Sequence, residues 1–182
     1  MKKKIHIIII LIISVFSICT TVFSQSSDNT LKAVALEKLS LFITWPNNVL
    51  PNNSSDVFIV AVLKNKAFGM NLEKIYKTHP IKNRKVQVVY INKIEELKNC
   101  HLLYISNTNA KELKKILAGV KNKPILLVSD KKGFAIAGSH INMYYSNDKL
   151  RFEINQMALE QAGFKIDYQL LHVSKIINPT TK

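Results

Sequence analysis

The fold is decided by residues 101–130, which read HLLYISNTNAKELKKILAGVKNKPILLVSD. Two short apolar runs, at 101–106 and 124–130, have the length and composition of buried β-strands. Between them, residues 110–120 place apolar side chains at helical spacing and end near Gly119, where a helix is expected to stop. A strand, a helix and a second strand in this order predict a right-handed crossover between parallel neighbours.

The same alternation continues toward the N-terminus. Two more apolar runs predict strands at 57–63 and 85–91, and short helical segments follow them at 70–76 and 93–99. An amphipathic first helix precedes these units and stops at Trp45-Pro46, because a residue before proline is restricted to extended conformations. Repeated units of one strand and one helix predict a mostly parallel sheet.

The C-terminal third has a different pattern. Segments 140–146 and 150–155 read HINMYYS and LRFEIN, and Asn147-Asp148 between them favours a tight hairpin turn. Helices predicted at 155–163 and 167–176 would pack over this hairpin. The predicted fold class is therefore α/β: a three-layer sandwich with a mostly parallel sheet, an antiparallel C-terminal hairpin edge, and helices on both faces.

The first 24 residues predict a signal peptide. Three lysines precede an apolar run, Ile5–Ile18, and small or polar residues lead to Ser24. The run is shorter than the roughly 20 residues that a membrane-spanning helix needs. We expect cleavage near Ser24 and export to the periplasm, with residues 25–182 forming a single domain. Lipid attachment at Cys19 is the alternative, and the bulky residues before this cysteine argue against it.

Composition restricts the class of partner. Removal of residues 1–24 takes away three of the 26 basic residues and none of the 12 acidic ones, which leaves 23 against 12. Such a charge is typical of nucleic-acid binding, but export separates the chain from nucleic acid. Scattered lysines indicate a solvated surface, with an acidic partner or an anionic lipid surface as the alternative. Only Cys100 remains after cleavage, so no intrachain disulfide can form and packing alone must stabilise the fold.

Four blocks of the chain resemble, in the same order, those of the YfiR family of periplasmic regulators. They are FITWP at 42–46, VFIVAVL at 57–63 with AFG after it, CHLLYIS at 100–106, and the long stretch from ILLVSDKKGF to LLHVSKII at 125–177. The resemblance implies a compact domain with helices on both faces of a mixed sheet. Gly138-Ser139 departs from the paired glycines that are common in the family, and redox control through disulfides does not carry over to this chain.

The resemblance also implies a function. We expect a non-enzymatic regulatory protein without a cofactor, which binds the extracytoplasmic part of a membrane signalling protein and holds it inactive. A diguanylate cyclase or a sensor kinase is the expected partner, with a role in cyclic di-GMP signalling and biofilm formation. The protein would reach the membrane only through this partner, and a homodimer is left open.

Two alternatives remain from the residues themselves. One is a periplasmic small-molecule sensor or solute-binding domain. The other is a hydrolase that uses Asp130 and His140, although the chain has no G-x-S-x-G, Walker, G-x-G-x-x-G or H-E-x-x-H motif. The histidines that follow residue 24 are not spaced as metal ligands, so we expect no metal site.

The candidate partner-binding residues lie mainly on the hairpin. Arg151, Glu153 and Asn155 alternate along LRFEIN, so they share one face of the strand. A solvated face or an internal ion pair is the structural alternative. Phe134 and Trp45 join the candidates as aromatic residues suited to interfaces, with burial as the other possibility.

The candidate ligand-binding residues are Ser129 and Asp130. They end a predicted parallel strand, and open α/β sheets bind ligands at the carboxyl ends of their strands. The alternative for Asp130 is to cap the turn at DKKGF, in which Gly133 would take a positive φ.

Overall fold

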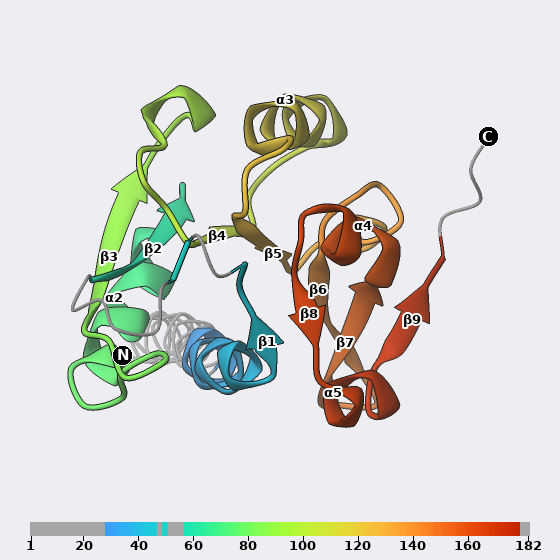
Figure 1. Ribbon diagram of the computed structural model, residues 1–182, viewed down its shortest axis with the longest axis horizontal. Coiled ribbons are helices and arrows are strands. Elements are labelled where there is room, and N and C mark those ends of the chain that lie inside the picture. Colours follow the sequence, from blue (N-terminus) through green and yellow to red (C-terminus); the bar gives the residue numbers. More distant parts are fainter. Residues whose placement is uncertain (1–27, 47–48, 51–56, 179–182) are drawn as a thin grey trace, which may run out of the picture.

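A seven-stranded mixed sheet forms the centre of the computed structural model, which describes residues 28–46, 49–50 and 57–178 (Figure 1). The strand order is β3-β2-β4-β5-β6-β7-β9, parallel from β3 to β6, with β7 antiparallel to β6 and β9 parallel to β7. The strands are β2 (Phe58–Leu63), β3 (Val86–Ile91), β4 (Leu102–Ile105), β5 (Leu126–Ser129), β6 (Ile141–Ser146), β7 (Lys149–Asn155) and β9 (Lys175–Ile177). The predicted α/β class is confirmed. The predicted signal peptide lies outside the described residues.

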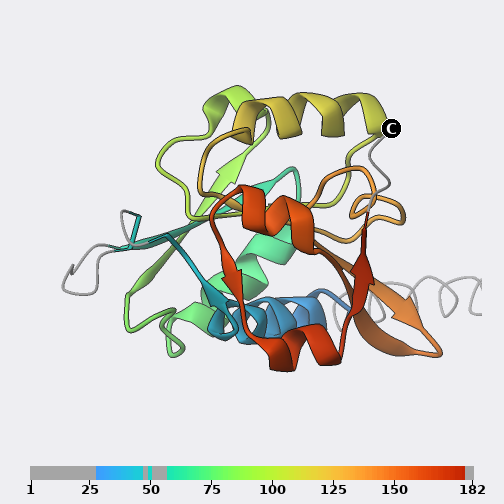
Figure 2. The ribbon, with the colours of Figure 1, turned by 45° about the vertical axis from the view of Figure 1, so that its right-hand side comes forward.

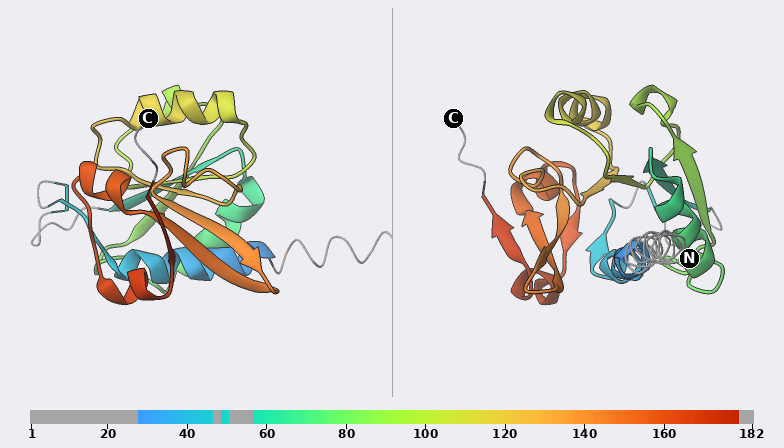
Figure 3. Two further views of the ribbon diagram at one scale, coloured as in Figure 1. Left: turned by 90° about the vertical axis from the view of Figure 1, so that its right-hand side faces the viewer. Right: turned by 180° about the vertical axis from the view of Figure 1, so that it is seen from behind.

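Helices cover both faces of this sheet. The first helix, 28–41, and α2 (Lys66–Tyr76) lie on one side, and α3 (Ala110–Val120) lies on the other with the 3-10 turn η1 (Ile94–Glu96), as the view from behind in Figure 3 also shows. Two short helices follow the hairpin, α4 (Gln156–Gln161) and α5 (Tyr168–His172). A small antiparallel ladder of β1 (Ile43–Thr44) with β8 (Lys165–Ile166) joins the end of the first helix to the C-terminal region. Within the described ranges, no helix is long and apolar enough to cross a membrane.

The core consists of two apolar clusters, one on each face of the sheet. Along β2, Val60 and Val62 belong to the cluster under the first helix and α2, whereas Ala61 and Leu63 belong to the cluster under α3. All four are buried, which explains the continuous apolar run in the sequence. Burial of a large aliphatic side chain contributes about 1.5–3 kcal/mol, so these two clusters are the main source of stability.

The predicted hairpin is confirmed. Asn147 and Asp148 both have positive φ, 50° and 56°, as the two central residues of a type I′ turn require. Ser146 pairs with Lys149 across this turn, and the ladder continues to Ile141 opposite Ile154.

The C-terminal end differs from the prediction. The helix expected over 167–176 is only α5, and the chain then forms β9, which pairs with β7 and becomes the outer strand of the sheet. Ile176 and Ile177 pack into the structure there, and strand pairing outweighs the helical spacing of the sequence. The helix predicted over 93–99 is likewise reduced to η1.

Candidate functional sites

The carboxyl ends of β2 and β4 form a topological switch point. From β2 the chain crosses to β3 on one side, and from β3 it returns to β4 on the other side of β2. Asn65 follows β2 and donates from Nδ2 to Ser106 Oγ after β4, at 3.0 Å, while its Oδ1 caps α2 by accepting from Phe68 N. Ligands of doubly wound sheets bind at such positions, so both pockets described next lie where this fold favours a site.

The first pocket contains Asp130. It has a volume of about 380 Å³ and is lined by polar groups of the first helix and of the loops after β2, β4 and β5, among them Asp28, Lys32 and Asn65. Asp130 Oδ2 accepts from Lys32 Nζ at 3.0 Å and from the Tyr104 hydroxyl at 2.8 Å. Lys32 Nζ also pairs with Asp28 Oδ2 at 2.8 Å. Asp130 therefore joins the first helix to the sheet through contacts that are distant in sequence.

The protonation of this cluster follows from its contacts. Burial of the Lys32 ammonium acts to lower its pKa, but hydrogen bonds to Asp28 and Asp130 outweigh burial, so the pKa is raised. Burial and the Asp130 charge raise the pKa of Tyr104 as well, so its hydroxyl stays protonated and donates. Asp28 Oδ1 is buried without a hydrogen-bond partner, so this pocket contains an unused acceptor.

Ser129 does not line this pocket. Its side chain is fully buried, and its hydroxyl donates to Asn142 Oδ1 at 2.8 Å on the neighbouring strand. Adjacent residues of a strand face opposite sides of the sheet, which separates Ser129 from Asp130. Of the two predicted ligand-binding residues, only Asp130 is therefore in a position to meet a ligand there.

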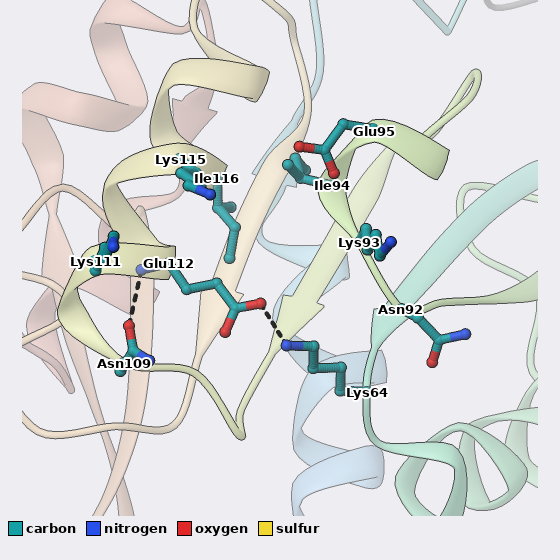
Figure 4. Close-up of a pocket in the computed structure, with 10 residues that line it drawn as sticks. All are labelled: Lys64, Asn92, Lys93, Ile94, Glu95, Asn109, Lys111, Glu112, Lys115 and Ile116. Atoms are coloured by element: carbon teal, nitrogen blue, oxygen red, sulfur yellow. Dashed lines mark hydrogen bonds and ion pairs between the residues drawn. The ribbon is translucent and has the colours of Figure 1, made fainter.

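The second pocket lies on the opposite face, between η1 and α3, and has a volume of about 700 Å³ (Figure 4). Its charged lining residues are Lys64, Lys93, Lys111 and Lys115 against Glu95 and Glu112. Lys64 Nζ pairs with Glu112 Oε1 at 2.6 Å, which connects the end of β2 to α3, and Asn109 caps α3 by accepting from Glu112 N. Lysine exceeds glutamate here, so the pocket has a positive potential.

The sequence analysis did not identify this second pocket. The signal that was present is the position of Lys64 and Lys93, which follow the apolar strands β2 and β3 closely. Carboxyl ends of neighbouring parallel strands meet at one edge of a sheet, so such lysines come together.

The hairpin face holds a polar row that crosses four strands. Asn142 Nδ2 donates to Glu153 Oε2 at 3.2 Å, and Lys175 Nζ pairs with Glu153 Oε1 at 3.2 Å. The row begins at Ser129, which bonds to Asn142, and Arg151 stands next to Glu153 on the same face. Arg151 is exposed and Glu153 is half-buried. The candidate face is therefore solvent-accessible at its Arg151 end.

Asn155 lies at the buried end of this face. Its side chain is 2% exposed, its Nδ2 donates to Ala135 O at 2.8 Å, and its Oδ1 accepts from Ala158 N to cap α4. Both polar atoms of the amide are therefore used within the fold. Asn155 as a direct partner contact stays a prediction, and in this structure its amide is buried where β7 enters the body of the protein.

The two aromatic candidates are also buried. Trp45 is 4% exposed, donates from Nε1 to His101 O at 3.0 Å, and packs edge-on against Phe58 and Phe164. Phe134 is 5% exposed and belongs to the core cluster under α3. In this conformation neither residue offers a surface to a partner, so burial, the structural alternative, accounts for both.

The groups named for the hydrolase alternative make separate contacts. His140 Nδ1 accepts from Leu127 N at 3.0 Å, and burial lowers the pKa of this histidine to about 4. Cys100 is buried too, and burial raises its thiol pKa to about 12, which makes it a core residue rather than a nucleophile. Among the described residues, no group of three or more His, Cys, Asp or Glu side chains could hold a metal ion.

The chain is similar to a described protein family and, at low sequence identity, to solved structures. A family model described as YfiR/HmsC-like matches residues 29–175. No curated protein matches the chain. A solved structure described as an ABC domain in complex with L-Trp from Streptococcus pneumoniae is 12% identical, with a TM-score of 0.47 over 66% of this chain and 55% of that one. A conserved domain protein from Vibrio cholerae O1 biovar eltor is 13% identical, with a TM-score of 0.48 over 72% of this chain and 57% of that one. The chain thus spans just over half the length of each structure.

Proposed function

The chain belongs to the YfiR/HmsC-like family, and from this premise we propose that it is an exported protein that restrains a membrane-bound signalling partner. The family is one of periplasmic regulators rather than catalysts. The proposed partner is a diguanylate cyclase or a similar sensor, which this protein holds inactive by binding its extracytoplasmic part. Cyclic di-GMP signalling and biofilm formation are the processes that such restraint would affect.

The observation that carries the proposal is the match of residues 29–175, which includes the sheet from β3 to β7, the hairpin and the polar row. The hairpin of β6 and β7 extends beyond the body of the protein (Figure 2). Tyr145 and Arg151 are exposed on it, and tyrosine and arginine are the residue types that most often dominate binding energy at interfaces. These exposed side chains support the proposal that the hairpin binds the partner.

Restraint of this kind is a population effect. This protein shifts the partner toward the state that it binds more tightly. The size of the shift equals the difference between its binding free energies for the active and the inactive state of the partner. A small molecule, envelope stress or another exported protein would release the partner by reducing this difference in binding free energy.

The direct test is capture of the partner. The tagged protein is used to pull down proteins from detergent-solubilised membranes of its own host, with Arg151→Ala beside the wild type. Lys121→Ala is the matched control, because it removes an exposed cation at the far end of α3. We expect the wild type and Lys121→Ala to enrich an integral membrane signalling protein and Arg151→Ala to lose it. Recovery of no such protein by the wild type contradicts the proposal.

A second candidate function rests on the Asp130 pocket. Its buried, unpaired Asp28 Oδ1 and its place at the switch point favour a small polar ligand, as a sensor or solute-binding domain would have. A thermal-shift screen distinguishes the two functions, because a ligand that binds only the native state raises the unfolding temperature. Loss of the shift in Asp130→Asn would assign the ligand to this pocket.

A further inference from the structure

The edge strand β3 has one unused side of hydrogen-bonding groups. Within the described residues it pairs only with β2. Lys85 O accepts from Phe58 N at 2.8 Å and Ile91 O accepts from Lys64 N at 3.0 Å, so the odd-numbered residues of the strand face β2. The N–H and C=O groups of one strand residue point to the same side. Val86, Val88 and Tyr90 therefore present three donors and three acceptors to the open edge.

The two edges of the sheet are protected to different degrees. The other outer strand, β9, has three residues, and short edge strands are a common protection against pairing. Strand β3 has six residues, VQVVYI, without a charge or a proline, and only Ile91 among them is buried. It combines high β-propensity with open backbone groups, which is the form that accepts an added strand.

Contacts with α2, on one face of the sheet, hold β3 in place. The Tyr90 hydroxyl donates to Glu73 Oε1 of α2 at 2.7 Å, and a Cβ on Gly69 would overlap the Tyr90 ring. The ring is therefore packed against α2, and the strand needs little ordering before it pairs. A preorganised surface loses less conformational entropy on binding.

Charge decides which occupant fits this edge. Exposed lysines flank the strand, Lys85 directly before it and Lys93 two residues after it. Glu95 and Glu96 follow Lys93, and the Glu96 carboxylate accepts from Asn92 N at 2.9 Å. A second copy of this chain would bring two such sets of lysines together in a protein whose residues 25–182 already carry 23 basic against 12 acidic residues. An extended segment with acidic ends and apolar residues between them meets complementary charge instead.

We propose that β3 binds an extended acidic segment of a partner protein as an additional outer strand, through Val86, Val88 and Tyr90, with Lys85 and Lys93 at its ends. The site is at the opposite end of the strand order from the hairpin, so it does not depend on the proposed restraint of a membrane partner.

The test uses the purified protein and a fluorescein-labelled heptapeptide of alternating valine and threonine with glutamate at each end. A matched peptide carries lysine at both ends. We expect fluorescence anisotropy to show at least about tenfold tighter binding of the glutamate peptide. Exchange of Lys85 and Lys93 for glutamate should invert this preference.

Val88→Pro tests the backbone pairing. It removes an outward N–H that makes no bond to β2, and proline is tolerated on an edge strand in that position. We expect binding to weaken at least about tenfold while the unfolding temperature is unchanged, whereas Val88→Thr keeps the N–H and should bind as the wild type does. Equal binding by Val88→Pro, or no binding of the glutamate peptide at millimolar concentration, overturns the proposal. Dimerisation in sedimentation experiments that Val88→Pro abolishes would identify a second copy as the occupant and also overturn it.

Discussion

Polar residues in the interior of the fold and polar residues on the hairpin tip look alike in the sequence but have different roles. Asp130, His140 and Asn155 are enclosed, and each bonds a group on another element. Arg151 is exposed on the projecting hairpin. The difference indicates that enclosed polar groups stabilise the tertiary structure, whereas an exposed hairpin side chain such as that of Arg151 can be replaced at little cost to stability. The four predictions below test this comparison, from the largest expected effect to the smallest.

Replacement of Asp130 by alanine should have the largest effect. The change leaves the Tyr104 hydroxyl enclosed without its acceptor and leaves Lys32 with Asp28 as its one remaining carboxylate, and loss of such an enclosed acceptor destabilises a fold by about 3 kcal/mol. Urea denaturation followed by Trp45 fluorescence measures the change. Glu95→Ala, at an exposed acid, is the control and should shift the free energy of unfolding by less than about 0.5 kcal/mol. A shift of the same small size for Asp130→Ala would contradict the claim that interior polar residues stabilise the fold more than surface ones do.

The pH dependence of stability should reflect His140. Because burial lowers its folded-state pKa to about 4, the unfolded state binds the proton more readily. Stability is therefore fully present above the ordinary histidine pKa of about 6.5 and is lost as the pH falls toward 4, by about 2–3 kcal/mol. The measurement compares urea denaturation of the wild type and His140→Gln between pH 7 and pH 4. Identical pH profiles would show that His140 is accessible to solvent protons.

Asn155→Ala should cost about 2 kcal/mol, because it removes the cap of α4 and leaves the Ala135 carbonyl without its donor. The free energy of unfolding measures this effect, and Asn155→Asp separates its parts, since aspartate can still cap the helix but cannot donate to Ala135. A stable Asn155→Ala that nevertheless fails to capture the membrane partner would restore this residue to the interface.

Arg151→Ala should have the smallest effect on folding, below about 0.5 kcal/mol, because its side chain is exposed. The same variant should show the greatest loss in partner capture. Thermal unfolding and the membrane pull-down, performed on one preparation, measure both. If Arg151→Ala lost both stability and partner capture, Arg151 would belong with the interior polar residues that stabilise the fold.

Much of the fold could be predicted because local patterns specify it. Strands β2, β4 and β5 are buried on both faces, so their sequences are continuous apolar runs. Helix α3 is buried on one face, so its apolar residues recur at helical spacing. The turn at Asn147-Asp148 was predictable for a similar reason, since residues of these types tolerate positive φ. The strand β9 was not predictable, because three residues acquire strand geometry only by pairing with β7.

By itself the sequence determined the α/β class, the order of most elements, the hairpin and the resemblance to the YfiR family. Tertiary structure alone decided which candidate residues are accessible. Lys32 and Asp130 lie 98 residues apart and meet only after the first helix docks on the sheet. Trp45, Phe134 and Asn155 become buried by the same assembly, whereas Arg151 stays outside it. The physical reason is that periodicity reports the direction of a side chain within its own element, and exposure depends on what the rest of the chain places against it.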